Sequence, residues 1–298
     1  MVNVIWILEN IKRHSSFYTE LGISLLLSSV IQWKKHNPNT KTVLYVDILT
    51  YKFLSDINAI ELWDKVYRCD FNEPIDKDIF WANSKLCVLT SIQEPSVVLD
   101  YDFLVYKSFE QFLKDKVIVG HEENGEDYYP HALDDYVRRT KHILNRPNHK
   151  SVNCCFNYYP NPAFARAYGS TSLELMRELT KLRAPNSKYL VYAEQLLLKH
   201  VLDLHNIEYT PLVTDIWHCQ TNKWSKGTKG LIDSKEAGLY FRHYWMEKNK
   251  ILDSSEGFNY INEINTLKKI ISNYSDVDID TISKLPIKTN YITPKHDR

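Results

Sequence analysis

Short apolar runs alternate with segments of helical periodicity over the first 120 residues, and this alternation restricts the fold more than any other feature of the sequence. Strands are expected at 2–8, 41–47, 65–68, 96–99 and 117–120. Helices are expected at 17–36, 53–60 and 80–90. Strands that alternate with helices favour a mostly parallel sheet with helices packed on its faces. The sequence therefore predicts an α/β protein.

The pattern is less regular in the second half of the chain. Thr171 and Glu174 have the spacing of a capping box, which predicts a helix starting there. Further helices are expected at 189–204 and 256–274, a strand at 209–217, a glycine-containing loop at 227–238 and a frayed tail over the last dozen residues. We divide the chain into a main domain, 1–252, and a C-terminal helix with its tail, 253–298.

Two aspartates, Asp100 and Asp102, follow the apolar run 96–99 and are themselves followed by apolar residues. Side chains two residues apart on an extended chain point the same way, so both carboxylates can reach one divalent cation. Two aspartates have this spacing at four places in the sequence, but only this pair stands in apolar surroundings. The alternative is a turn that carries two solvated acids.

The balance of charged residues narrows the class of protein. Lys+Arg and Asp+Glu number 37 each, which argues against the broad basic field of a protein that mainly binds nucleic acid. A local basic patch, which we interpret as a solvated helix face, contains Arg138, Arg139, Lys141, His142, Arg146, His149 and Lys150.

Location is also constrained by the sequence. The apolar stretch 21–31 is too short to span a bilayer, and no signal pattern opens the chain. The five cysteines lack paired Cys-x-x-Cys spacing, so neither a disulfide framework nor a zinc site is indicated. We expect a cytoplasmic protein with free thiols and no membrane span.

The order of several short motifs resembles that of GT-A-fold glycosyltransferases, in particular the family of glycogenin-like and mannosyltransferase-like enzymes. Segment 80–85 resembles the lysine-bearing helix before the metal motif, and 98–104 resembles the Asp-x-Asp strand end. Segment 153–157 resembles the Asn-x-Gly strand of the family, with a cysteine in place of the glycine. Glu194-Gln195 and the histidine of 241–245 complete the set. The resemblance implies one GT-A-type, Rossmann-like domain with a helical C-terminal extension.

The resemblance also implies a metal site. Asp100 and Asp102 would hold Mn²⁺ or Mg²⁺, and His243 would add a nitrogen ligand that suits Mn²⁺ better. His218 is the competing candidate for that third ligand. For His243 the alternative is a histidine packed in an aromatic cluster.

Donor and acceptor contacts are implied in the same way. Lys85 would neutralise a phosphate, while Asp47 and one of the paired aspartates, Asp100, would contact uracil or ribose. Asn153 would touch the sugar or the acceptor, and Glu194 and Gln195 would face the sugar. Each has an ordinary structural alternative: a solvated lysine, a turn aspartate, a buried asparagine that ties loops together, or helix groups bonded to neighbouring backbone.

The expected function is metal-dependent transfer of a sugar from a nucleotide diphosphate donor, a UDP-sugar, to an unknown acceptor hydroxyl. The acceptor can be a glycan, a protein or a modified DNA base, and the resemblance mildly favours retention of configuration. Two alternatives stay open. One is a nucleotidyltransferase on a related fold, and the other is a non-catalytic carbohydrate-binding protein that uses the many aromatic residues.

Overall fold

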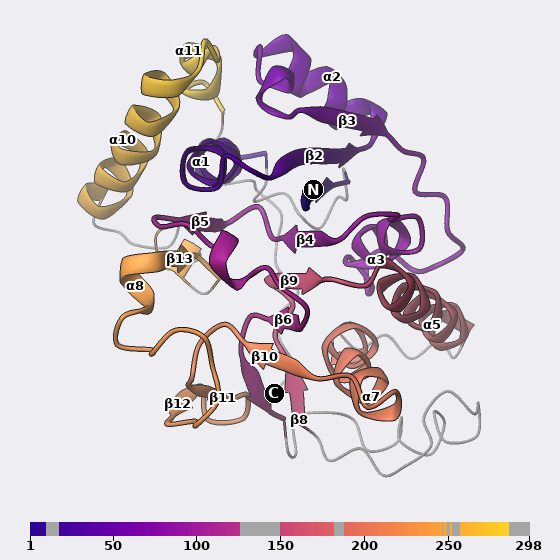
Figure 1. Ribbon diagram of the computed structural model, residues 1–298. Helices are drawn as coiled ribbons and strands as arrows, with labels where there is room; N and C mark the ends of the chain where they lie inside the picture. Colours follow the sequence, from indigo (N-terminus) through magenta and orange to yellow (C-terminus); the bar gives the residue numbers. More distant parts are fainter. Residues whose placement is uncertain are drawn as a thin grey trace.

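The computed structural model describes residues 1–9, 18–125, 150–181, 188–245, 247–248, 251 and 257–285. Its centre is a seven-stranded sheet of order β10-β6-β9-β4-β1-β2-β3 (Figure 1). The strands are β1 (Asn3–Leu8), β2 (Lys41–Val46), β3 (Lys65–Arg68), β4 (Ser96–Leu99), β6 (Val117–Val119), β9 (Phe156–Tyr159) and β10 (Tyr209–Pro211). Within this sheet only β9 pairs antiparallel with its neighbours. The predicted α/β fold with a mostly parallel sheet is confirmed.

Helices cover both faces of this sheet (Figure 1). Strand β1 shows why: Val4 and Trp6 pack towards α1 (Glu20–His36), while Ile5 packs towards the opposite helices. Successive strand residues point to opposite faces, so an unbroken apolar strand supplies two cores. The helices opposite α1 are α3 (Asn83–Leu89), α5 (Pro162–Lys181) and α7 (Leu197–Leu204).

The C-terminal helix α10 (Gly257–Tyr274) packs against α1 (Figure 1). Leu267 lies in one buried cluster with Leu21 and Leu25, and its carbonyl oxygen accepts a hydrogen bond from Ser28 Oγ at 3.4 Å. The short helix α11 (Ile279–Ile282) follows. No described helix is long and apolar enough to cross a membrane.

Two smaller sheets extend the edge at which the parallel strands end. The four-stranded sheet, of order β12-β11-β7-β8, contains β7 (Glu122–Asn124), β8 (Lys150–Val152), β11 (Ile216–His218) and β12 (Lys223–Ser225). The two-stranded sheet joins β5 (Phe103–Val105) to β13 (Phe241–His243). Since β7 follows β6 and β8 precedes β9, the four-stranded sheet continues directly from the carboxyl edge of the large one.

Three sequence predictions are wrong in detail. The helix expected at 53–60 is α2 (Ile48–Asp56), which begins earlier because Asp47 caps it, and η2 (Ile60–Leu62) follows it. The helix expected from Thr171 is α5, which starts at Pro162; Thr171 Oγ1 donates to the carbonyl of Ala167 instead of capping. The strand expected at 209–217 is two strands, β10 and β11, in different sheets.

The remaining elements follow the prediction more closely. The helix expected at 189–204 consists of α6 (Lys188–Val191), a π-helical turn η4 (Tyr192–Leu196) and α7. The loop at 227–238 ends in α8 (Ala237–Tyr240), and η3 (Glu110–Phe112) lies between β5 and β6. The predicted tail and all of the basic patch except Lys150 lie outside the described residues.

Candidate active site

Polar and reactive side chains gather at the carboxyl edge of the large sheet. Glu9 follows β1, Asp47 follows β2, Asp100 follows β4 and His121 follows β6, while Cys155 precedes the antiparallel β9. All five positions therefore lie at the same edge. In open α/β sheets this is the edge where ligands bind.

The described residues contain one group of side chains that could hold a metal ion. It consists of Asp100, Asp102 and His243. One ligand atom from each lies within 4.8 Å of the others. The pairing of β13 with β5 places His243 opposite Phe103, and Tyr244 N donates to the Asp102 carbonyl at 3.1 Å. Two carboxylates and one imidazole are a donor set that fits Mn²⁺ and other divalent first-row metal ions. His243 is thus brought to the aspartates by strand register.

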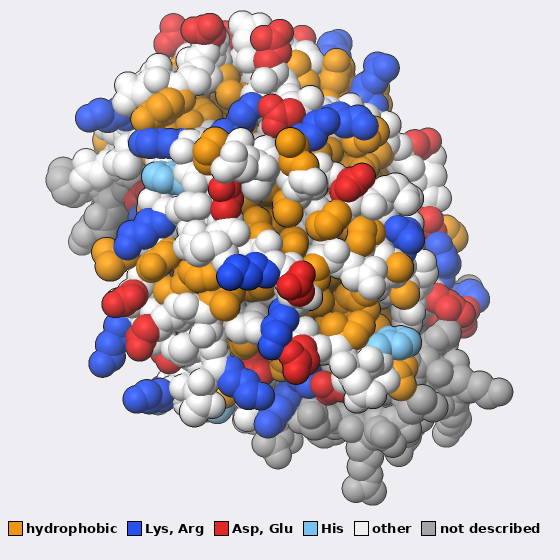
Figure 2. All heavy atoms as spheres, viewed as in Figure 1, with side chains coloured by type: hydrophobic (Ala, Val, Ile, Leu, Met, Phe, Trp, Pro, Cys, Tyr) orange, Lys and Arg blue, Asp and Glu red, His pale blue; other side chains and the backbone are white. Residues whose placement is uncertain are grey.

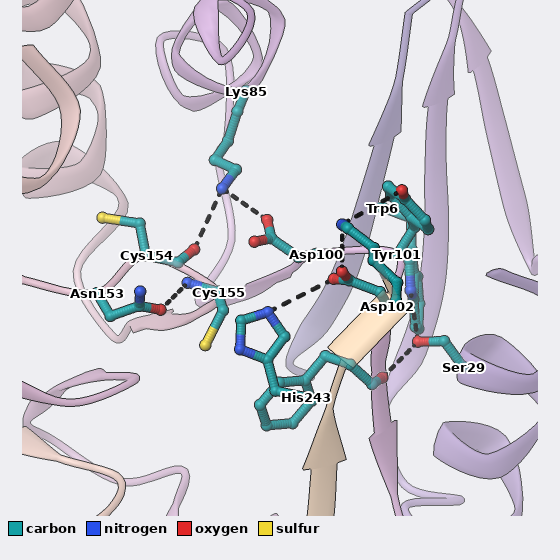
Figure 3. A network of polar contacts seen from close by, with 12 residues as sticks. Trp6, Ser29, Lys85, Asp100, Tyr101, Asp102, Asn153, Cys154, Cys155 and His243 are labelled. Atoms are coloured by element: carbon teal, nitrogen blue, oxygen red, sulfur yellow. Dashed lines mark hydrogen bonds and ion pairs between the residues drawn. The ribbon is translucent and has the colours of Figure 1, made fainter. Parts of the chain in front are cut away.

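Lys85 connects Asp100 to Glu194. Its Nζ donates to Asp100 Oδ1 at 2.7 Å, to Glu194 Oε1 at 3.0 Å and to the Cys154 carbonyl at 3.2 Å. Figure 3 shows the lysine reaching towards Asp100 from its helix, with His243 on the other side of the paired aspartates. Burial lowers the pKa of Lys85, but the two carboxylates outweigh it and hold this pKa well above its usual value. The ammonium group is therefore charged.

Lys248 pairs with the second aspartate. Its Nζ lies 2.6 Å from Asp102 Oδ2, and His243 Nε2 lies 3.5 Å from Asp102 Oδ1. Burial raises the pKa of Asp102, but Lys248 and His243 outweigh it, so this pKa stays well below its usual range. Burial lowers the pKa of His243, which Cys155 and Asp102 raise to a net value well above the usual one. The site therefore concentrates charge of both signs in a place with little water.

Glu194 lies in the π-helical turn η4, and its side chain is 93% buried. A π-turn inserts an extra residue into a helix and re-aims the side chains there, which is common at functional sites. Burial raises the pKa of Glu194 despite the opposing effect of Lys85. Of the two residues predicted in this turn, Glu194 joins the site through Lys85, whereas Gln195 is partly exposed and makes no hydrogen bond to the described site residues.

Two other predicted residues have structural partners. Asp47 caps α2 by accepting hydrogen bonds from Leu49 N and Thr50 N. Asn153 is buried; its Nδ2 donates to Glu123 Oε1 at 3.0 Å and its Oδ1 accepts from Cys155 N at 3.0 Å. These contacts are those of the structural alternatives, although both residues lie at the carboxyl edge.

His218, the competing metal ligand, lies elsewhere. It is on β11, where its Nε2 lies 2.6 Å from Ser225 Oγ on β12, and it is not part of the described metal-ligand group. The structure thus brings together His243 and the paired aspartates and leaves His218 in the four-stranded sheet.

A pocket of about 560 Å³ opens at the ends of β1, β2 and β3. Its lining includes Glu9, Asp47, Arg68, Phe71 and Lys77. The Glu9 side chain is 93% buried and paired with Lys77 through Oε1, while its Oε2 has no hydrogen-bond partner among the described residues. Strand β1, which Glu9 follows, lies next to β4. The pocket and the metal-ligand group therefore share one edge of the sheet.

Sequence reasoning missed Lys248 and the buried pair of His121 with Glu123. Lys248 belongs to the segment 239–248 that follows the glycine-containing loop, but nothing in its immediate sequence marks it as a partner of Asp102. His121 directly precedes β7 and Glu123 is its middle residue, with His121 Nε2 3.2 Å from Glu123 Oε1. Strand β7 is only three residues long, so the sequence around it carries too short a pattern to predict a strand.

No family model and no curated protein sequence matches this chain. Solved structures of glycosyltransferases do. The glycosyltransferase GlyE from Streptococcus pneumoniae TIGR4 has a TM-score of 0.39 and 10% identity, over 71% of this chain and 46% of GlyE. The galactosyltransferase LgtC, solved with donor and acceptor sugar analogues, has a TM-score of 0.39 and 12% identity, over 65% of this chain and 70% of LgtC. The PaToxG glycosyltransferase has a TM-score of 0.36 and 14% identity, over 68% of this chain and 67% of PaToxG.

These structural neighbours are GT-A glycosyltransferases, at low sequence identity. The chain spans a little less than half of GlyE. With TM-scores of 0.36 to 0.39 the likeness is distant, so the case for a reaction rests on the site itself.

Proposed function

We propose that this protein is a metal-dependent glycosyltransferase that moves a sugar from a nucleotide diphosphate donor to an acceptor hydroxyl. The observation that carries the proposal is the meeting of Asp100, Asp102 and His243 at the carboxyl edge, on the same edge as the pocket at β1 to β3. The proposed metal is Mn²⁺, or Mg²⁺ in its place. The proposed metal-dependent transfer uses a cation bound beside the diphosphate of the donor. Asp100, Asp102 and His243 are the potential ligands for that cation.

The pocket at β1 to β3 is the proposed place for the nucleoside. Its volume of about 560 Å³ is within the range of small-molecule sites, roughly 300–1,000 Å³. Glu9 Oε2, buried without a partner among the described residues, would accept an N–H of the base or a ribose hydroxyl. Arg68 and Lys77 supply positive charge in the lining. The UDP part of the proposed UDP-sugar comes from the sequence resemblance.

Bond changes in the proposed reaction are simple. The bond between the sugar C1 and the diphosphate oxygen breaks, the acceptor oxygen bonds to C1, and the hydroxyl proton is released. A bound cation would act as a Lewis acid on the departing diphosphate. Lys85 and Lys248 are already charged beside the two aspartates, so they would offset the negative charge that builds up there.

Glu194 is the proposed side chain facing the reacting sugar. Lys85 holds its carboxylate towards Asp100, and burial raises its pKa, so it is a better proton acceptor than an exposed glutamate. A proton-accepting Glu194 supports inversion, whereas the sequence resemblance supports retention. We extend the proposed donor and acceptor contacts to Asp47 and Asn153 at the same edge, and to Gln195 next to Glu194 in η4.

Two further points belong to the proposal. The five cysteines are free, and the proposed location is the cytoplasm. Lys/Arg and Asp/Glu side chains are interspersed on the face in Figure 2, without a single-sign field. This fits a glycan or protein acceptor better than modified DNA.

Asp100→Asn tests the proposal. Asp100 is one-third exposed, and Lys85 keeps Glu194 as a partner in the variant, so the fold should tolerate the change. We expect wild-type protein to release UDP from a UDP-sugar only when Mn²⁺ is present, and the variant to be at least 100-fold slower (about 2.7 kcal/mol) because one carboxylate ligand is lost.

Asp276→Asn is the matched control, because Asp276 has the same two-residue spacing to Asp278 and is exposed. It should leave the rate unchanged. Full activity in Asp100→Asn would contradict the proposal. Release of pyrophosphate from a nucleoside triphosphate, with no turnover of any nucleotide sugar, would instead assign the site to a nucleotidyltransferase.

A further inference from the structure

Three tryptophans lie together beside the site and have no role in the chemistry described so far. Trp217 on β11 and Trp224 on β12 are directly opposite each other in the antiparallel pair, with ring centroids 5.1 Å apart and ring planes at 62°. The ring of Trp245 lies 5.4 Å from that of Trp217, at 75°. We call these three residues the tryptophan platform.

Exposure within the platform is uneven. Trp217 is buried at 6% exposure, whereas Trp224 is 49% exposed and Trp245 is 37% exposed. No other tryptophan among the described residues is a large exposed hydrophobic. An exposed indole leaves a large apolar surface in water. Two exposed indoles, those of Trp224 and Trp245, pack against the buried Trp217, and this arrangement indicates a binding surface rather than core packing.

The platform starts at the metal-ligand group. The ring of Trp245 is parallel to the His243 imidazole, at 6° with centroids 6.4 Å apart. On the other side, the His121 ring lies 4.8 Å from that of Trp224. The His121 side chain is in turn paired with Glu123. A ligand on the ring of Trp245 would therefore lie beside the metal-ligand group.

We propose that the tryptophan platform binds a sugar ring of a carbohydrate acceptor; this inference rests on the proposed glycosyltransferase function. The C–H face of a pyranose packs on an indole face, while its hydroxyl groups stay in water or bond to polar neighbours. Placed on Trp245, such a ring would present a hydroxyl towards His243 and the paired aspartates. The acceptor class is thereby narrowed to glycans.

Ring geometry favours a sugar over a nucleobase. A flat base is best held between or upon parallel aromatic faces, as in single-strand-binding proteins. The three tryptophan rings instead meet edge to face, at 62° and 75°, and so form an angled apolar corner; the parallel pair, Trp245 with His243, includes a proposed metal ligand. A puckered, non-aromatic ring fits such a corner better than a flat one does.

Trp224→Ala tests this inference by direct binding, without a donor. The probe is an array of immobilised neutral and acidic oligosaccharides, with a 20-nucleotide single-stranded DNA as the competing class. We expect wild-type protein to bind at least one glycan class and not the DNA, and Trp224→Ala to bind that class at least tenfold more weakly. Trp224→Phe keeps an aromatic ring and should retain most of the binding. Tyr274→Ala, at another exposed aromatic on α10, is the control and should bind as wild type does.

Absence of glycan binding by wild type, unchanged binding by Trp224→Ala, or binding of the DNA alone would overturn the inference. Should Trp224→Ala not fold, Trp245→Ala, at the other exposed tryptophan of the platform, takes its place and should bind the same glycan class at least tenfold more weakly. Wild-type UDP release, measured in parallel, separates the two proposals. Glycan binding without UDP release overturns only the glycosyltransferase assignment, and UDP release without glycan binding overturns only the platform.

Discussion

Buried carboxylates at the carboxyl edge each have identifiable partners, and Glu123 is the most completely bonded of them. His121 Nε2 lies 3.2 Å from Glu123 Oε1, Asn153 Nδ2 donates to the same oxygen, and Ser151 Oγ donates to Oε2 at 3.3 Å. Burial raises the pKa of Glu123, but His121 and the other donors outweigh it and hold the pKa below the usual 4.5. A carboxylate whose pKa falls on folding stabilises the folded state when it is ionised.

The Glu123→Gln substitution should therefore lower stability in a pH-dependent way. Above pH 4.5, the unfolded value, the ionised wild-type group contributes its full stabilisation; as the pH falls through the lower folded pKa this contribution is lost. We expect the variant to be less stable by about 1–3 kcal/mol at pH 7, and the difference to shrink towards pH 3.

Urea unfolding at several pH values measures this difference. Glu61→Gln, at an exposed glutamate, should show no such trend. A gap between wild type and Glu123→Gln that stays constant from pH 7 to pH 3 would show that the carboxylate charge is not the cause.

Residue chemistry was partly readable from the sequence. Asp100 and Asp102 were found because an apolar strand leads directly into them, and the motif order indicated His243 and Lys85. The sequence did not indicate Lys248, because its pairing with Asp102 depends on where the chain returns after β13. Long-range pairing of this kind leaves no local pattern.

Helices position the site through close packing, and the contact of α5 with α3 is an example. A Cβ added at Gly169 of α5 would lie 2.8 Å from the Leu86 carbonyl oxygen and 2.9 Å from Leu89 Cβ. Both atoms belong to α3, the helix that carries Lys85. The glycine is thus needed for the two helices to approach, and Lys85 depends on that approach.

Replacing this glycine by alanine, Gly169→Ala, should destabilise the protein by about 1–3 kcal/mol, because the backbone of α3 must move to accept the methyl group. The displaced helix should also weaken the pairing of Lys85 with Asp100. Gly238→Ala is the control, since a Cβ there meets nothing within 4 Å. Thermal unfolding of both variants checks the prediction, and equal melting temperatures would show that α3 and α5 can separate at no cost.

Strand positions were predictable from the sequence, but helix starts were less so. The five strands expected in the first 120 residues are present. They were predictable because short continuous runs of β-branched and apolar residues are typical of strands in a buried parallel sheet. The start of α5 at Pro162 was missed because Thr171 and Glu174 imitate a cap in the middle of a long helix. The π-turn η4 was missed because it has no sequence signature separate from that of a helix.

On the scale of the whole molecule, the site is assembled from segments that are far apart in the chain. Lys85 comes from α3, Asp100 and Asp102 from the turn after β4, and Glu194 from η4. His243 comes from β13, whose pairing with β5 closes the site. The fold class was predictable from local alternation, whereas this convergence required the topology of all three sheets.

The central claim is that Asp100, Asp102 and His243, which come from two distant segments, hold one cation. Pulsed electron paramagnetic resonance of Mn²⁺ bound in the presence of UDP tests this claim directly. An imidazole coordinated to Mn²⁺ gives a ¹⁴N hyperfine coupling in the spectrum. Wild-type protein should show this coupling, His218→Gln should keep it, and His243→Gln should lose it. A wild-type spectrum without ¹⁴N coupling, or a coupling that survives in His243→Gln, would contradict the account.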